Sequence, residues 1–347
     1  IQVDAIAAWD GNKWNSFGTG LSDSVLALAK IGPTKVAVAG SFTSTPAGPA
    51  SRIAIWDGAA WSALGSGVNG SAYAVASNTV GAIFVGGSFT QAGGGSANRI
   101  ARWSGNQWTP LGSGSSATVR AIASLGGERV VAGGAFDIDQ GMPAQTIAEW
   151  DGLAWKKLGG GLVGTVSAIV RLPNGDIAAG GLFSLITNAP RVNIARWNGS
   201  TWTAIGSGLN GQVLCMAILS NGDLIAGGQF SRSGSTPLNF IARWNGSEWL
   251  PLGTGLPFWV SSVSVLPDGR VAAGRWQSTE GDSLQSHVAI WDGSSWTNID
   301  SGIDHDVLAI TTLDNGEIVA GGRFHIVDGA VSAQIARFAT SPKPWVA

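Results

Sequence analysis

The sequence predicts an all-β fold built from one repeated sheet, on three observations. The motif (Ile/Val)-Ala-x-Trp-x-Gly-x-x-Trp recurs every 47 residues, starting near residues 6, 53, 100, 147, 194, 241 and 288, and a shortened copy, IARF, starts near 335. Between the motifs, apolar and polar residues alternate with the period of a strand. Asn-Gly and Asp-Gly turn pairs separate the alternating segments. A fixed period of this length indicates one supersecondary unit per repeat, and residues 1–347 are therefore expected to form a single domain.

Each repeat is expected to supply a four-stranded antiparallel sheet with strands a to d. In one copy these strands are expected at 213–219, 223–230, 240–244 and 249–253. Asn221-Gly222 lies between strands a and b, where a tight hairpin requires positive φ. In an earlier copy, Asp57-Gly58 joins strands c and d. A hairpin there makes Trp56 and Trp61 cross-strand partners on one face of the sheet.

Both faces of such a sheet are apolar, and this predicts how the sheets are arranged. Trp56 and Trp61 lie on one face, whereas Ile53 and Leu64 lie on the other. A sheet that is apolar on both faces needs neighbours on both sides, which seven radially arranged sheets provide. The prediction is a seven-bladed β-propeller with four antiparallel strands per blade. Fourteen periodic tryptophans are then core residues, and three of the 17 lie outside the pattern: Trp259, Trp276 and Trp345.

The ring is expected to close through the N-terminal strand, which would join the C-terminal blade. That blade would take strands a and b from residues 307–324 and strand d from residues 14–17. Two copies of strand c are available to it, at 6–9 and at 335–338, and the sequence leaves open which one is used.

The order VAGGxF, IARWxG and WxxLG resembles the kelch-type repeat, as found in bacterial secreted proteins and in the propeller of galactose oxidase. The resemblance extends over essentially the whole chain, although Arg275-Trp276 interrupts the pattern in the sixth repeat. It implies a propeller but no single function, because kelch-type propellers include both binding modules and enzyme domains. The copper site of galactose oxidase needs two tyrosines, and Tyr73 is the only tyrosine here. Copper chemistry of that kind is excluded.

Composition argues against several classes of partner. Charged residues make up 12% of the chain and the net charge is -2, so no basic surface for nucleic acid is expected. No apolar run approaches the roughly 20 residues of a membrane helix, and membrane insertion is not expected. Cys215 is the single cysteine and lies in an apolar strand, which favours a buried structural thiol. No disulfide, metal or cofactor is expected.

Motifs with catalytic or metal-binding chemistry are weak. Asp137-Ile138-Asp139 begins like a calcium loop, but the later ligands and the closing Glu are absent. Glu280 with Asp282 is interpreted as a pair of solvated loop carboxylates. His305 and His325 come from one repeat and, with neighbouring aspartates, are the best candidates for metal binding or proton transfer. The glycine-rich stretch 65–71 precedes a strand and is interpreted as a bend, since a phosphate loop precedes a helix.

A ligand site is expected on the face formed by the d–a and b–c loops, here called the top face, around the sixth and seventh repeats. A position that is identical in every copy serves the fold, so function is expected where one copy departs from the others. Phe258 and Trp259 offer a stacking surface there. A structural alternative is that Trp259 fills a packing gap. The predicted ligand-binding residues are Phe258, Trp259, Arg275, Trp276, Glu280, Asp304, His305 and His325.

The function predicted from these features is a non-enzymatic binding or scaffold propeller, secreted or at the cell surface, with a protein or glycan ligand on the top face. One alternative is a multivalent lectin, because near-equivalent clefts would repeat around the ring. A second alternative is a lyase or hydrolase that uses histidine and aspartate on the top face.

Overall fold

A computed structural model describes most of the chain: residues 6–9, 14–18, 20–135, 146–185, 189–276, 287–299, 303–327, 330–331 and 335–338. Within these ranges the secondary structure consists of strands and turns, and no helix occurs. Accordingly, no helix in the described ranges is long and apolar enough to cross a membrane.

Six four-stranded antiparallel sheets, or blades, follow one another along the described chain, and each is named here by its innermost strand. The first three blades are β3 (Val25–Lys30), β4 (Val36–Gly40), β7 (Ile53–Trp56) and β8 (Trp61–Ala63); β9 (Ala72–Ser77), β10 (Ile83–Gly87), β13 (Ile100–Ser104) and β14 (Gln107–Pro110); and β15 (Val119–Gly126), β16 (Arg129–Gly134), β17 (Ile147–Trp150) and β18 (Trp155–Lys157). The next three are β19 (Val163–Arg171), β20 (Ile177–Ser184), β21 (Ile194–Trp197) and β22 (Trp202–Ala204); β23 (Val213–Ile218), β24 (Leu224–Gly228), β27 (Ile241–Trp244) and β28 (Trp249–Pro251); and β29 (Trp259–Val265), β30 (Val271–Trp276), β31 (Val288–Trp291) and β32 (Trp296–Asn298).

One further sheet, the closing sheet, has five strands and joins the two ends of the chain. Its strands, from the innermost outwards, are β33 (Val307–Thr312), β34 (Ile318–Gly322), β37 (Ile335–Phe338), β1 (Ile6–Trp9) and β2 (Trp14–Gly18). The pair β1–β37 is parallel, with Ala7 opposite Ala336. The two strands run in the same direction because both are copies of strand c.

The prediction of a seven-bladed propeller is therefore wrong, because the described structure has six four-stranded blades. The all-β composition and the four-stranded blade agree with the prediction. The discrepancy arises at ring closure. The two copies of strand c do not compete for one place, since both are retained in the closing sheet.

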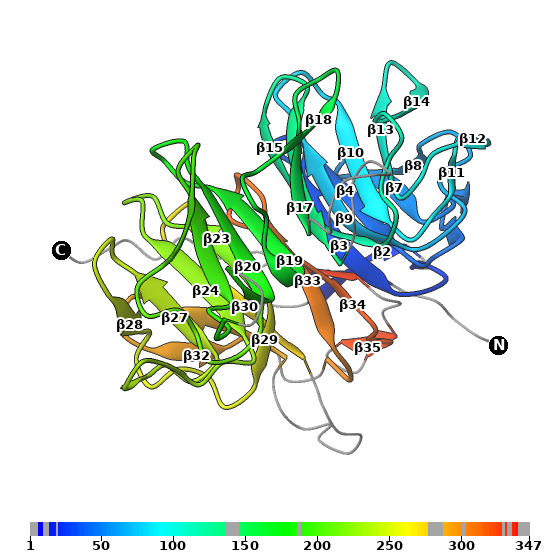
Figure 1. The fold of residues 1–347 in the computed structure, drawn as a ribbon. Helices are drawn as coiled ribbons and strands as arrows, with labels where there is room; N and C mark the ends of the chain where they lie inside the picture. Colours follow the sequence, from blue (N-terminus) through cyan, green and yellow to red (C-terminus); the bar gives the residue numbers. More distant parts are fainter. Residues whose placement is uncertain are drawn as a thin grey trace.

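The inner strands form a closed ring around the propeller axis (Figure 1). Each inner strand contacts the inner strand of the next blade, and β33 of the closing sheet contacts β3. Four b–c loops on the top face add small two-stranded hairpins: β5 (Ser44–Thr45) with β6 (Gly48–Pro49), β11 (Gln91–Ala92) with β12 (Gly95–Ser96), β25 (Arg232–Ser233) with β26 (Thr236–Pro237), and β35 (Ile326–Val327) with β36 (Ala330–Val331).

The predicted tryptophan pairs are confirmed. Trp56 lies opposite Trp61, with ring centroids 5.4 Å apart. The turn between them is held by Asp57, whose Oδ1 accepts the backbone N–H groups of Ala59 and Ala60. These two hydrogen bonds favour the charged form and lower the pKa of the Asp57 carboxyl. The Asp-Gly pair of this motif is therefore turn chemistry.

A hydrogen bond between neighbouring blades depends on the second tryptophan of each pair. The indole Nε1 of Trp108 donates to the carbonyl oxygen of Leu64 in the preceding blade, at 2.8 Å. The same bond, here called the indole bond, recurs with a sequence separation of 44 residues in four further places: Trp155 to Leu111, Trp202 to Leu158, Trp249 to Ile205 and Trp296 to Leu252. The periodic tryptophans therefore join blades as well as fill the space between them.

Glycine follows the carbonyl acceptor of each indole bond, for two reasons. Gly206 has a φ of +60°, which L side chains rarely adopt. In addition, a Cβ atom on Gly206 would lie 2.6 Å from the ring of Trp244 in the next blade. The glycines at this position thus serve backbone geometry and close aromatic packing.

Replacing Trp249 by Phe tests the indole bond. The substitution keeps an aromatic ring but removes the indole donor, while the backbone N–H of Gly208 still donates to the carbonyl of Ile205. We therefore expect a loss of about 0.5–1.5 kcal/mol in the free energy of unfolding, measured by denaturant titration. The control is Trp259→Phe, at an indole that is 36% exposed, where we expect less than about 0.5 kcal/mol. Equal effects of the two substitutions would contradict the role assigned to the indole bond.

Candidate functional site

The predicted ligand-binding residues that the structure describes lie where the β29 blade meets the closing sheet. Phe258 and Trp259 are at the start of β29, and Arg275 and Trp276 end β30. Trp259 and Trp276 are cross-strand partners. The others flank the closing sheet, with Asp304 and His305 before β33 and His325 after β34. Glu280 lies outside the described residues.

Arg275 occupies a position that other blades fill with glycine. The second glycine of the Gly-Gly pair is so close to the inner strand that a Cβ atom would overlap the carbonyl oxygen of the residue that precedes this strand, as Gly228 illustrates with Gln212. The same overlap is found at Gly40, Gly87, Gly181 and Gly322. The β29 blade therefore differs locally from its neighbours, because it accommodates a long cationic side chain at this point.

The side chain of Arg275 is enclosed. Arg275 is 7% exposed, and its guanidinium carbon lies 5.5 Å from the centre of the Phe258 ring. A cation over an aromatic face at this distance is attracted by the ring quadrupole, and burial strengthens the attraction. The backbone N–H of Arg275 donates to the carbonyl of His287 at 2.9 Å. Phe258, Arg275 and His287 therefore form one packed unit.

His287 is fully buried at the edge of this unit. Burial lowers the pKa of its imidazole to about 4, and the positive charge of Arg275 acts in the same direction, against a smaller opposing effect of Asp306. His287 is therefore neutral at neutral pH, next to a buried cation.

Asp306 supplies the negative charge of the junction. Its side chain is 2% exposed and lies 3.7 Å from a guanidinium nitrogen of Arg323. The Asp306 carboxylate also lies 3.5 Å from Nδ1 of His305. That nitrogen accepts the backbone N–H of Asp306, at 2.8 Å. The set Phe258, Arg275, His287, Asp306 and Arg323 is called the Arg275 cluster below.

Asp304 has a counterpart in other blades, which indicates a structural role for this predicted residue. Its Oδ1 accepts the backbone N–H of His325 and so ties the d–a loop to the b–c loop. Asn69 and Asn210 occupy the same repeat position and make the equivalent bonds to their own b–c loops. Asp304 and His325 are therefore brought together, but by a contact that belongs to the fold.

Three residues of the Arg275 cluster were not among the predicted ligand-binding residues: His287, Asp306 and Arg323. The repeat contains the signal for two of them. Asp306 stands where other copies have Ser24, Ser71, Thr118, Thr165 and Gln212, and Arg323 stands where others have Ser41 and Ser88. His287 has no such signal, because the other copies already differ at its position, with Arg52, Arg99, Thr146, Asn193 and Phe240.

Metal binding and nucleophilic chemistry find little support in the described part of the chain. No group of three or more His, Cys, Asp or Glu side chains there is placed to hold a metal ion. Asp137, Asp139 and Asp282 lie outside that part. Burial raises the pKa of the Cys215 thiol, whose Sγ donates to the carbonyl of Val260, so the thiol stays protonated.

Comparison with known sequences supports a propeller without giving a function. The family described as the Rax2 C-terminal beta propeller domain matches residues 147–318, and a beta-propeller domain of unknown function, DUF5122, matches residues 81–102. These matches do not support the resemblance to kelch-type repeats. Among curated proteins, none matches the chain.

Solved structures with a similar fold come from several kinds of protein. The extracellular domain of the putative one component system BT4673 from B. thetaiotaomicron superposes with a TM-score of 0.62 at 10% identity, over 97% of this chain and 40% of that one. The WD40 repeats of RRP9 give a TM-score of 0.61 at 14% identity, over 96% and 99% of the two chains. The WD40 propeller of Doa1 gives 0.55 at 13% identity, over 92% and 93%. At these identities the likeness concerns the fold alone.

His287 is expected to make stability depend on pH. Because the pKa of its imidazole is about 4 in the folded protein and has its ordinary value of 6.5 in the unfolded chain, the unfolded state binds more protons between these pH values. The stabilisation is fully present above about pH 6.5 and is lost as the pH falls towards 4, with a total change of roughly 2–4 kcal/mol. Denaturant titrations at several pH values in this range should show that the free energy of unfolding of His287→Thr, which copies Thr146 of the β15 blade, changes less with pH than that of the wild-type protein.

The control for this measurement is His325→Thr, at an exposed side chain for which Thr43 and Thr90 are the counterparts. This variant should keep the pH dependence of the wild-type protein. A His287→Thr variant whose stability changes with pH as steeply as that of the wild type would contradict the assignment.

Proposed function

We propose that this chain is a non-enzymatic binding or scaffold propeller that holds a protein segment on its top face, at the Arg275 cluster and Trp259. One observation carries the proposal. Where the other blades have glycine and small polar residues, a single junction contains a buried arginine, a buried aspartate and an exposed tryptophan.

The chemistry of this junction suits a protein ligand. Tryptophan and arginine are enriched among the residues that contribute most to protein interfaces. Trp259 is 36% exposed and is among the large hydrophobic side chains of the described residues that face solvent. Arg275 is held in place by Phe258 beside it, so binding would cost little side-chain entropy there. Trp259 is the proposed anchor, and Arg275 is a positioning residue that supports the surface around it.

An extracellular or cell-surface location fits the same proposal. The low fraction of charged residues and the abundance of Trp and Gly motivate it. A propeller of similar fold is the extracellular domain of a putative one component system. The whole activity of that longer protein is not carried over, since this chain corresponds to 40% of it.

The multivalent lectin alternative requires near-equivalent clefts around the ring, and the side chains at the blade junctions are not equivalent. The last two residues of the outer strand are Ser62 and Ala63 in one blade, but Lys156 and Lys157 in another. The alternative of a lyase or hydrolase depends on His305 and His325. The contacts described for that region include the bond from the backbone of His325 to Asp304 and the contacts of Asp306 with His305 and Arg323, and none of these joins the two imidazoles.

Selection of peptides on the protein tests the proposal. A random peptide library displayed on phage is selected on the wild-type protein, and the enriched peptides are then measured against Trp259→Ala. We expect binding to weaken by at least about tenfold, which corresponds to about 1.4 kcal/mol. Thermal melting of the same variant shows whether the fold is retained.

The matched control is Leu153→Ala. Leu153 is 89% exposed but lies in a c–d turn, at the opposite end of the strands from Trp259. This variant should bind the selected peptides like the wild-type protein. If the peptides bind Trp259→Ala as tightly as the wild-type protein, whether or not the variant is less stable, the proposed surface is wrong.

A further inference from the structure

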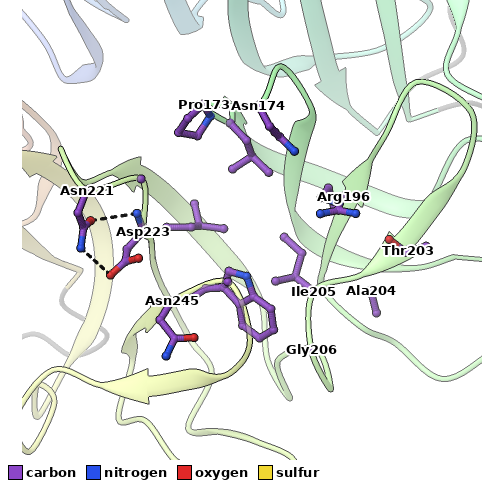
Figure 2. Close-up of a pocket in the computed structure, with 15 residues that line it drawn as sticks. Pro173, Asn174, Arg196, Thr203, Ala204, Ile205, Gly206, Asn221, Asp223 and Asn245 are labelled. Atoms are coloured by element: carbon purple, nitrogen blue, oxygen red, sulfur yellow. Dashed lines mark hydrogen bonds between the residues drawn. The ribbon is translucent and has the colours of Figure 1, made fainter.

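A groove lies on the face of the propeller opposite the top face, between the β19 and β23 blades. Its walls are the a–b turns of both blades, the outer strand β22 and the c–d turn after Trp244, and the enclosed space is about 500 Å³. Figure 2 shows Asn221, Asp223 and Asn245 on one side and Arg196 and Thr203 on the other. Because a–b and c–d turns lie at the opposite end of the strands from the top face, this groove is separate from the Arg275 cluster.

The charges of the groove cancel. Two of its lining side chains are ionised, Arg196 and Asp223. Arg196 lies 3.3 Å from the carboxylate of Asp176, and Asp223 lies 3.4 Å from the guanidinium of Arg243. Both ions are therefore paired within the protein, each across neighbouring strands b and c. The groove has no excess charge that would favour an anion or a cation.

The uncharged polar side chains of the groove are amides and a hydroxyl, which can donate and accept hydrogen bonds. Asn174, Asn221 and Asn245 contribute side-chain amides, and Thr203 contributes a hydroxyl. Asn221 is fixed in place, because its Nδ2 donates to Asp223 at 3.0 Å while its Oδ1 accepts the backbone N–H of Asp223 at 3.1 Å. Asn174 makes the same two bonds to Asp176 in the other blade. The side chains of Asn174 and Asn221 at the edges of the groove are thus fixed by hydrogen bonds to residues two positions away in the sequence.

The groove also has an aromatic wall. Trp244 lines it and is partly exposed, and its ring packs against Gly206. An aromatic ring presents a large, rigid contact surface to apolar groups, while nearby amides and charged groups orient a ligand by hydrogen bonds. A ligand with apolar C–H faces and many hydroxyl groups matches both features.

A small side chain on the outer strand borders this groove, and it differs between blades. Thr203 lies opposite Arg196, and both residues line the groove. Ala204 lies on the other face of the sheet, since it alternates with Thr203 and shares its face with Trp202, whose indole donates to Leu158 of the preceding blade. The residue equivalent to Thr203 is Lys156 in the β15 blade and Leu250 in the β23 blade. The repeat thus supplies larger side chains that the fold already tolerates at this position.

We infer that the groove between the β19 and β23 blades is a binding site for a neutral oligosaccharide, with Trp244 as the stacking surface and Asn174, Asn221 and Asn245 as hydrogen-bonding groups. Its volume lies within the range of about 300–1,000 Å³ that is typical of small-molecule sites. The inference is independent of the proposed function, since it concerns the opposite face and a different class of ligand.

Titration with defined sugars tests this inference. The neutral probes are maltotriose, cellotriose and tri-N-acetylchitotriose, and the charged comparators are trigalacturonate and chitosan trimer. Binding is followed by saturation-transfer NMR and by tryptophan fluorescence. We expect at least one neutral probe to bind with a dissociation constant of about 1 mM or below, and Thr203→Lys, which copies Lys156, to weaken that binding by at least about tenfold.

The matched control is Ser62→Lys, which places the same side chain at the equivalent position of the β3 blade, away from the groove. This variant should bind like the wild type. Thr203→Leu, which copies Leu250, is a second variant that fills the groove and should also weaken binding if Thr203→Lys fails to fold.

Three results would overturn the inference. They are the absence of saturable binding of all neutral probes up to roughly 10 mM, binding of the charged probes alone, and equal loss of binding in Ser62→Lys and Thr203→Lys. Peptide binding at Trp259 is measured separately, so a negative result with sugars leaves the proposed function of the top face standing.

Discussion

The hydrogen bond from a tryptophan indole to a carbonyl of the preceding blade is the interaction on which the rest of this structure depends. A four-stranded sheet with two apolar faces has no stable form alone, and its neighbours must meet it at a fixed distance and angle. The indole bond sets that geometry, because it needs both a ring packed between blades and an acceptor positioned by the end of the previous outer strand. The glycine after each acceptor follows from the same constraint, since any side chain there would meet the other tryptophan of the pair.

Because the junctions between blades are similar, a residue that departs from the repeat is easily recognised. The second glycine of each Gly-Gly pair lies where the inner strand leaves no room for a Cβ atom. Arg275 at that position requires a local change of the β29 blade, and a buried cation requires compensating groups. The ring of Phe258, 5.5 Å from the guanidinium carbon of Arg275, is one such group. The free-energy cost of burying Arg275 at one junction is consistent with a role beyond folding.

The two ends of the strands then carry different kinds of surface. At the top face, long d–a and b–c loops bring aromatic and charged side chains together, and Trp259 is exposed among them. At the other face, short Asn-Gly and Asp-Gly turns keep their polar side chains fixed by local hydrogen bonds. The first surface suits a protein segment, whereas the second forms a small polar groove with an aromatic wall.

The sequence alone determined the all-β composition, the four-stranded unit, the tryptophan pairs and the turns, because each depends on residues that are close along the chain and recur every 47 positions. It also pointed to the junction of the sixth and seventh repeats, through the departures at Phe258, Trp259 and Arg275. Closure of the ring was decided by tertiary structure. Both copies of strand c have the same sequence pattern, and only the pairing of β1 with β37 shows that neither is displaced. The inclusion of His287 in the Arg275 cluster and the groove beside Thr203 were likewise invisible in the sequence, because each is made by side chains from different blades, and the distance between blades is set by packing rather than by any local pattern.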